Sequence, residues 1–136
     1  MTVMKLDHVG IIVKNVDATA AAVERTIGLK LTETAIYKDI LKIGFIPIGG
    51  VDIELLEPIT SEGLNAEFLR DRGEGVHHMA FQVDNLDAAV AAAVEQGAQV
   101  ILGPTEGARG KRIVFLAGDE LGGTIIELLE TPASTA

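Results

Sequence analysis

The amino-acid sequence predicts an α+β fold made of two tandem copies of one β-α-β-β-β module. The pentapeptide Ile-Glu-Leu-Leu-Glu occurs twice, at residues 53–57 and again at residues 126–130. A second pair of similar segments precedes these copies: Asp-His-Val-Gly-Ile-Ile-Val at residues 7–13 matches His-His-Met-Ala-Phe-Gln-Val at residues 77–83. Both pairs are separated by about 70 residues, and this common spacing indicates a duplicated unit.

The length and composition indicate one compact domain covering residues 1–136. A chain of 136 residues with 48% hydrophobic residues can bury a substantial core. The absence of cysteine excludes disulfides and thiolate metal ligands. No apolar run approaches the roughly 20 residues that a membrane span requires, and no signal-peptide pattern is present, so we expect a cytoplasmic protein without a membrane partner. The net charge of −9 disfavours nucleic acid as a partner.

The first module covers residues 5–58 and begins with a strand at residues 6–13, where apolar side chains alternate. Asp17 is the predicted N-cap of a helix from residue 18 to about residue 27, and Gly28 ends this helix. Three further strands are predicted at residues 30–36, 40–46 and 51–56, with Pro47 and Gly49-Gly50 in the turn before the last.

A polar bridge at residues 59–75, with a short helix at residues 64–72, leads to the second module at residues 76–130. This module repeats the order of the first, with a strand at residues 76–83, a helix capped by Asp87 and ending near Gly97, and strands at residues 99–102, 111–117 and 124–129. The tail, residues 131–136, is expected to fray. One module alone would leave a face of its sheet uncovered, so we expect the two to form a curved mixed sheet with helices on its outer face.

Strand alternation places four polar residues on one face of the expected sheet. The apolar side chains at alternate positions of residues 9–13 pack beneath the first helix, so His8 points to the opposite face. In the last strand of the module, the apolar neighbours of Glu54 also face the helix, and Glu54 therefore shares the face of His8. The second module repeats this arrangement with His78 and Glu127.

These two histidines and two glutamates predict a metal site. Four polar groups on an inner face would be costly to bury without partners, and one divalent cation satisfies all of them. Imidazole and carboxylate donors without sulfur suit Co²⁺, Mn²⁺, Ni²⁺, Fe²⁺ or Zn²⁺. Four protein ligands on a six-coordinate ion leave two positions for a chelating substrate, which is the arrangement of a catalytic site. The predicted metal ligands are His8, Glu54, His78 and Glu127.

The neighbouring polar residues have simpler interpretations. A single histidine on a strand is more often structural than a ligand, and the equivalence of two His-Glu pairs is what favours metal binding here. His77 is expected on the helix side or at the rim of the sheet, in a structural or supporting role. Glu57 and Glu130 face away from the predicted metal and are expected to be exposed to solvent.

These residues resemble the vicinal oxygen chelate superfamily, which includes glyoxalase I, extradiol dioxygenases, fosfomycin-resistance proteins and methylmalonyl-CoA epimerases. The paired modules and four-ligand metal site of that superfamily match the chain from Lys5 to Glu130. Within it, the chain is most similar to the methylmalonyl-CoA epimerases, at residues 45–49, 53–58, 68–81 and 122–128. The most specific of these matches is Arg-Gly-Glu-Gly-Val-His-His at residues 72–78. The chain departs from the epimerase pattern at Ala22-Val23, Lys38-Asp39 and Ala117-Gly118-Asp119.

The resemblance implies a metal-dependent isomerase that interconverts (2R)- and (2S)-methylmalonyl-CoA by α-proton abstraction and a metal-stabilised enolate. It implies Glu127 as one proton-transfer group, and Lys42 occupies a position where some relatives carry a catalytic glutamate. Arg109, Lys111 and Arg112, at the end of a flexible glycine-rich loop at residues 103–110, are candidates to bind the phosphates of CoA. The expected partners are an acyl-CoA substrate and a second copy of the chain in a homodimer.

Three other functions are compatible with the same resemblance. A glyoxalase I-like lyase acting on a glutathione hemithioacetal would use the same metal and the same proton transfer. An extradiol-type dioxygenase is disfavoured, because such enzymes usually hold iron with two histidines and one glutamate. Bleomycin-binding relatives are not enzymes and generally lack the metal ligands, so the complete set of four argues against that class.

Overall fold

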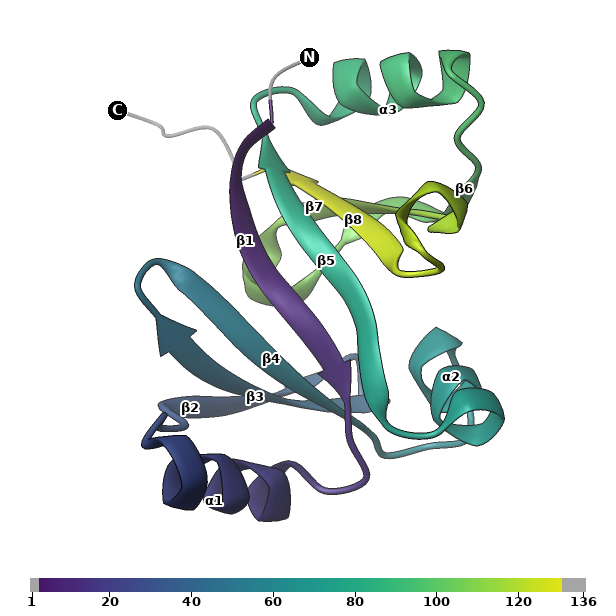
Figure 1. Cartoon of the computed structure of the whole chain (residues 1–136). Coiled ribbons are helices and arrows are strands. Elements are labelled where there is room, and N and C mark those ends of the chain that lie inside the picture. Colours follow the sequence, from purple (N-terminus) through teal and green to yellow (C-terminus); the bar gives the residue numbers. More distant parts are fainter. Residues whose placement is uncertain (1–2, 131–136) are drawn as a thin grey trace. The chain divides into compact units, whose positions relative to one another are not determined.

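The computed structural model describes residues 3–130 (Figure 1). The predicted frayed tail at residues 131–136 lies outside the described residues. Of the described residues, 8–77 form one compact unit, and 78–130 together with 3–7 form the other. Each unit carries one β-α-β-β-β module, which confirms the predicted α+β fold class.

In chain order, the strands and helices of the first module and the bridge are β1 (Val3–Ile12), α1 (Val16–Ile27), β2 (Glu33–Tyr37), β3 (Leu41–Ile48), β4 (Val51–Pro58) and α2 (Leu64–Arg72). Those of the second module are β5 (Gly75–Val83), α3 (Leu86–Glu95), β6 (Val100–Glu106), β7 (Arg112–Leu116) and β8 (Ile125–Glu130), with short 3-10 turns at Ala108–Gly110 and Asp119–Leu121. No helix among residues 3–130 is long and apolar enough to cross a membrane.

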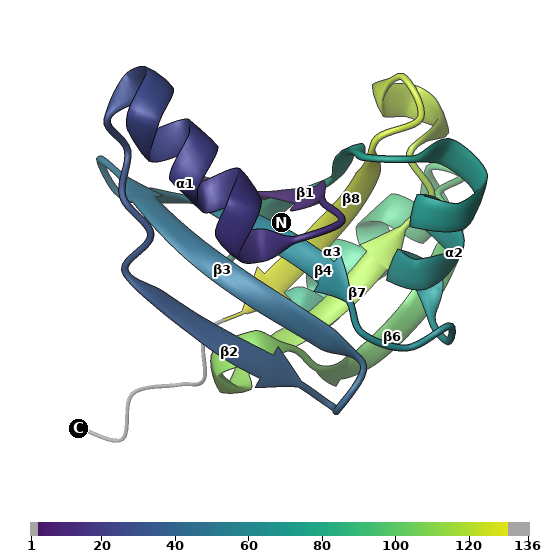
Figure 2. The ribbon, with the colours of Figure 1, turned by 90° about the horizontal axis from the view of Figure 1, so that it is seen from below.

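The strands of the first module follow the order β2-β3-β4-β1. β1 runs parallel to β4, and β3 is antiparallel to both β4 and β2. Helix α1 packs on one face of these strands, as Figure 2 shows for α1 against β3. The core beneath it contains Val13, Val16, Ala20, Ile46 and Leu55. These are the helix-side residues that strand alternation predicts.

Gly44 on β3 leaves no room for a side chain beneath α1. A Cβ atom at Gly44 would lie 2.6 Å from Val16 Cγ1 and 2.8 Å from Leu31 Cδ1, both closer than non-bonded carbons can approach. A larger residue here would push α1 away from the sheet.

The second module repeats this plan in the order β5-β8-β7-β6, with β5 parallel to β8 and the other pairs antiparallel. Helix α3 packs on a core that contains Val83, Leu86, Ala89, Val114, Leu116 and Leu128. β6 is longer than predicted: Gly103 lies within it, and its residues Thr105 and Glu106 pair with β7. The predicted flexible loop at residues 103–110 is therefore wrong over its first half.

Both helices begin two residues earlier than the sequence interpretation proposed. The N-caps are Asn15 and Asn85, not Asp17 and Asp87, and each asparagine side chain accepts a hydrogen bond from the backbone N–H three residues later. Asn satisfies this free N–H as well as Asp does, and the β-region backbone of Asn15 fits the cap position. The C-terminal prediction for α1 is confirmed, since Gly28 ends the helix in the left-handed conformation with φ 74°.

Pro47 was predicted in a turn but lies inside β3, opposite Asp52 of β4. β2 pairs with β3 only as far as Phe45, so along the described chain no β2 residue needs a backbone N–H from position 47. The turn itself consists of Gly49 and Gly50, which both have positive φ.

Candidate functional site

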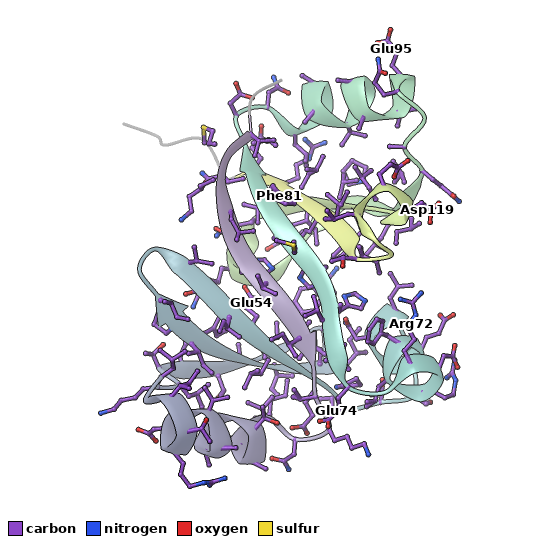
Figure 3. All side chains as sticks on the ribbon, in the orientation of Figure 1. Glu54, Arg72, Glu74, Phe81, Glu95 and Asp119 are labelled. Atoms are coloured by element: carbon purple, nitrogen blue, oxygen red, sulfur yellow. The ribbon has the colours of Figure 1, made fainter. Side chains whose placement is uncertain are left out.

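His8 and Glu54 form a buried pair in the first module. They lie on the neighbouring parallel strands β1 and β4, where His8 is in register with Asp52 and Glu54 follows two residues later on the same face. His8 Nδ1 and Glu54 Oε2 are 3.1 Å apart, and the two residues are only 6% and 7% exposed. Figure 3 labels Glu54 on β4.

His78 and Glu127 form the equivalent pair in the second module. They lie on the parallel strands β5 and β8 with the same offset, since His78 is in register with Ile125. His78 Nε2 and Glu127 Oε1 are 3.3 Å apart, and the residues are 4% and 5% exposed. Phe115 on β7 is in register with Glu127 on β8. Its ring makes an edge contact with His78, with 5.3 Å between the ring centroids. The duplication therefore extends to the His-Glu contact, although His8 makes it through Nδ1 and His78 through Nε2.

Each pair has the chemistry of half a metal site. A carboxylate removed from water is costly to bury unless charged or strongly donating groups surround it, and a divalent cation is such a group. The donors are nitrogen and oxygen without sulfur, a set that suits first-row divalent cations. The residues present thus fit the divalent ion that the sequence predicts.

His77 is buried but belongs to different surroundings. It is 2% exposed, and its ring meets Phe68 of α2 edge-on at 5.0 Å between centroids. Burial, and secondarily the charge of Arg72, lowers the pKa of His77 from 6.5 to about 4, so the imidazole is neutral at pH 7. Arg72, labelled in Figure 3, places its guanidinium carbon 5.3 Å from the centroid of the Phe68 ring. The sequence predicted His77 on the helix side or at the rim of the sheet, and in the structure it packs against the bridge helix α2.

Lys42 lies on the opposite face of β3 from the His8–Glu54 pair. Its Nζ atom is 3.0 Å from Asp17 Oδ2 in the first turn of α1. Phe45, three residues along β3, is the residue in register with Glu54, so Lys42 has the helix-facing parity. The candidate role of Lys42 as a second proton-transfer group is not compatible with this position.

The three candidate phosphate-binding cations do not form one patch. Lys111 Nζ pairs with Asp7 Oδ1 at 3.1 Å, whereas Arg112 Nη2 pairs with Asp87 Oδ1 at 2.8 Å, on the side of α3. The hydrogen bond to Asp87 raises the pKa of Arg112, and the guanidinium stays charged. Arg109 lies in the 3-10 turn before them with φ 62°. Adjacent residues of an extended chain point to opposite faces, which separates Lys111 from Arg112.

Glu57 and Glu130 are not the solvent-exposed residues that the sequence interpretation expected. Glu57 Oε1 accepts a hydrogen bond of 2.8 Å from the backbone N–H of Val16, the first residue of α1. Glu130 Oε1 accepts one of 3.0 Å from the backbone N–H of Leu86, the first residue of α3. The signal was present in the sequence, because these glutamates complete the repeated pentapeptides.

The fold and the duplicated buried pairs define a class of protein, and sequence comparison identifies it. Residues 7–115 match the Glyoxalase/Bleomycin resistance protein/Dioxygenase superfamily, and the chain belongs to this family.

Among similar proteins, the uncharacterized protein YqjC of Bacillus subtilis is 34% identical over 93% of this chain and 91% of its own length. The ethylmalonyl-CoA/methylmalonyl-CoA epimerase of Cereibacter sphaeroides is 32% identical over 91% of this chain and 96% of its own. A solved structure of a Streptomyces coelicolor methylmalonyl-CoA epimerase variant in complex with 2-nitronate-propionyl-CoA superposes with a TM-score of 0.87 at 29% identity, and covers 97% of this chain and 100% of the epimerase.

Proposed function

We propose that this protein is a metal-dependent epimerase that interconverts (2R)- and (2S)-methylmalonyl-CoA. The observation that carries the proposal is the pair of buried His-Glu contacts, His8–Glu54 and His78–Glu127, at equivalent positions of the two modules. Family membership and the named epimerases among its relatives direct the choice of reaction within the superfamily.

We propose that His8, Glu54, His78 and Glu127 together hold one divalent cation, with Co²⁺, Mn²⁺, Ni²⁺ and Zn²⁺ as candidates. Two carboxylates balance the charge of a dication, and two neutral imidazoles complete the donor set. A bound divalent ion would supply Lewis-acid chemistry that acidifies the α-carbon between the thioester and the carboxylate of the substrate.

Epimerisation requires removal of the proton at C2 of the acyl group and its return on the other face. Glu127 is the proposed group for one of these transfers, since it is a carboxylate buried to 95% beside a histidine. Proton transfer by a positioned carboxylate is general acid–base catalysis, which this step requires. Lys42 is not proposed for the second transfer, because its ammonium group is paired with Asp17.

For the CoA moiety, we propose that the segment from Arg109 to Arg112 contributes to phosphate binding, chiefly through Arg109 and Lys111. Phosphate contacts by these cations would weaken as ionic strength rises. An acyl-CoA affinity that is the same at low and high salt, or unchanged in Lys111→Met, would remove this part of the proposal.

The reaction is tested directly by deuterium exchange at C2 of (2R)- and (2S)-methylmalonyl-CoA, followed by NMR with Co²⁺-loaded and chelator-stripped protein. Metal-dependent exchange into both isomers is the expected result. Stoichiometric metal binding without exchange would retain the metal site and reject this substrate; glutathione hemithioacetals would then be the next substrates to test.

The ligand assignment is tested by Glu54→Ala and Glu127→Ala, with Glu62→Ala at an exposed position as a matched carboxylate control. Either of the first two should lose metal affinity and exchange activity, and the control should lose neither. Full metal content and full activity in Glu54→Ala or Glu127→Ala would contradict the assignment of that glutamate as a metal ligand. A cytoplasmic location and a homodimer stay predictions; sedimentation analysis of the purified chain tests the second.

A further inference from the structure

We propose that Glu57 and Glu130 are positioning residues that fix the metal-ligand glutamates by tying their strands to the helix N-termini. The inference rests on the proposed metal site and concerns the residues that hold its ligands. Glu57 is the fourth residue of a run that begins with Glu54, and Glu130 stands in the same relation to Glu127.

Glu54 and Glu57 lie three residues apart on strand β4. Residues three apart lie about 10 Å apart along it and point to opposite faces. Glu54 therefore faces His8 while Glu57, on the other face of β4, receives the backbone N–H of Val16 at 2.8 Å. The strand is thus held on both faces within about 10 Å of its length. Rotation of β4 that turned Glu54 away from His8 would break the bond to Val16.

The bond to Glu57 is made at the N-terminus of α1, where a carboxylate is favoured. The first N–H groups of a helix have no partner within the helix and lie at the positive end of its dipole, where a carboxylate is favoured. Asn15 already accepts from the N–H of Ala18, so Glu57 satisfies a separate donor, that of Val16. The bond from the Val16 N–H to Glu57, here called the tether, is therefore additional to the Asn15 N-cap of α1.

Both modules contain the same bond between a strand glutamate and the first N–H of a helix. In the second module Glu130 accepts from the first N–H of α3, that of Leu86, while Asn85 accepts from Ala88. The cation in register with each glutamate, Lys42 or Arg112, pairs with the aspartate in the first turn of the same helix. Two modules that differ at most positions thus keep the same bonds between helix and ligand strand.

Core packing is the competing explanation for the orientation of the ligand glutamates. Leu55 and Leu128, next to them in the chain, are buried against the same helices. Hydrophobic contacts are not directional and tolerate small rotations of a strand. If packing alone set the ligand geometry, loss of the tether would reduce stability without changing the metal site. The experiment must separate these two outcomes.

The test is titration of chelator-stripped protein with Co²⁺, with affinity and the visible d–d spectrum as readouts. Glu57→Ala is expected to weaken Co²⁺ binding about 10- to 100-fold, the usual effect of losing a residue that orients a ligand, and to alter the spectrum. Glu57→Gln keeps a side-chain oxygen for Val16 and should restore most of the affinity. Glu130→Ala and Glu130→Gln should behave in the same way.

Asn15→Ala is the matched control, because it removes a hydrogen bond from the same helix N-terminus without touching β4. It should lower stability and leave Co²⁺ affinity within about twofold. Wild-type affinity and spectrum in Glu57→Ala and Glu130→Ala, or an equal loss in Asn15→Ala, would overturn the proposal.

Three further outcomes are distinguishable. If Glu57→Ala does not fold, Glu57→Asp keeps the charge but is one methylene too short for Val16, and it should show the same loss of affinity; wild-type affinity there would overturn the tether. If the wild-type protein binds no Co²⁺, the proposed metal site fails first and the tether has no ligand to position. If Co²⁺ binds but methylmalonyl-CoA is not a substrate, the tether is judged by the affinities alone.

Discussion

At the scale of single residues, the two glutamates of each repeated pentapeptide have different tasks. Glu54 and Glu127 contact histidines, whereas Glu57 and Glu130 accept hydrogen bonds from helix N-termini. Strand parity alone separates the two sets, because an odd spacing places them on opposite faces. What parity could not predict was the partner of the second set: a sequence shows that Glu57 leaves the metal face but not that a helix begins opposite it.

The same parity leads to a prediction for Lys42. Lys42→Met should leave the rate of metal-dependent deuterium exchange within about twofold, because its ammonium group faces Asp17 on the helix side. The ion pair is largely exposed on the aspartate, with Asp17 71% exposed, so its loss should cost at most about 1 kcal/mol of unfolding free energy. NMR exchange assays and urea unfolding measure the two quantities. A tenfold or greater loss of exchange at unchanged metal content would return Lys42 to the catalytic candidates.

At the scale of elements, helix capping shows where the sequence interpretation was off by two residues. Asn-hydrophobic-Asp occurs at both helix starts, and either polar residue can serve as a cap. Asn15 takes that role, and the N–H of Val16, the first residue of the helix, is bonded to Glu57. This bond joins residues 41 positions apart, and local propensity does not contain such information. The bridge helix Leu64–Arg72, by contrast, was predicted with its observed ends.

Capping gives a direct comparison of two substitutions in one helix. Asn15→Ala should destabilise the protein by about 1 kcal/mol, because the N–H of Ala18 loses its acceptor. Asp17→Ala should cost less, since it removes only a surface ion pair with Lys42. Urea unfolding of both variants measures the difference. The reverse order would mean that Asp17, not Asn15, caps α1 in solution.

The fit of α1 on its sheet depends on Gly44. Gly44→Ala should destabilise by about 1–3 kcal/mol, because the added methyl group overlaps Val16 Cγ1 and Leu31 Cδ1. Val16→Ala removes one of these neighbours at a cost of about 0.8 kcal/mol per lost methyl group. In the double variant the two changes should compensate, with a total at least about 0.5 kcal/mol below the sum of the single effects. Strict additivity in urea unfolding would show that the overlap is relieved elsewhere.

At the scale of the whole molecule, duplication is the feature that the sequence showed best. The spacing of two short repeats predicted both modules and the equivalence of the two His-Glu sets, but not the parallel strand pairing that brings each histidine beside its glutamate. Strand ends were less predictable: β6 extends to Glu106 because it pairs with β7, and composition alone made Gly103 and Pro104 resemble loop residues. Pairing between segments distant in sequence, not local preference, decides such ends.

Duplication also leads to a prediction for the stoichiometry of the proposed metal site. A His-Glu pair has only two donors, too few for tight binding of a first-row ion, so one ion should require both pairs. The wild-type chain should therefore bind one Co²⁺, and His8→Ala or His78→Ala should each weaken that single site. At free metal about a thousandfold above Kd, binding contributes about 4 kcal/mol to stability, so removal by a chelator should lower Tm. Isothermal titration, metal analysis and thermal unfolding test this together. Two ions per chain, with one retained at full affinity in His78→Ala, would instead mean that each module binds its own ion, and a shared centre that chelates one substrate would have to be abandoned.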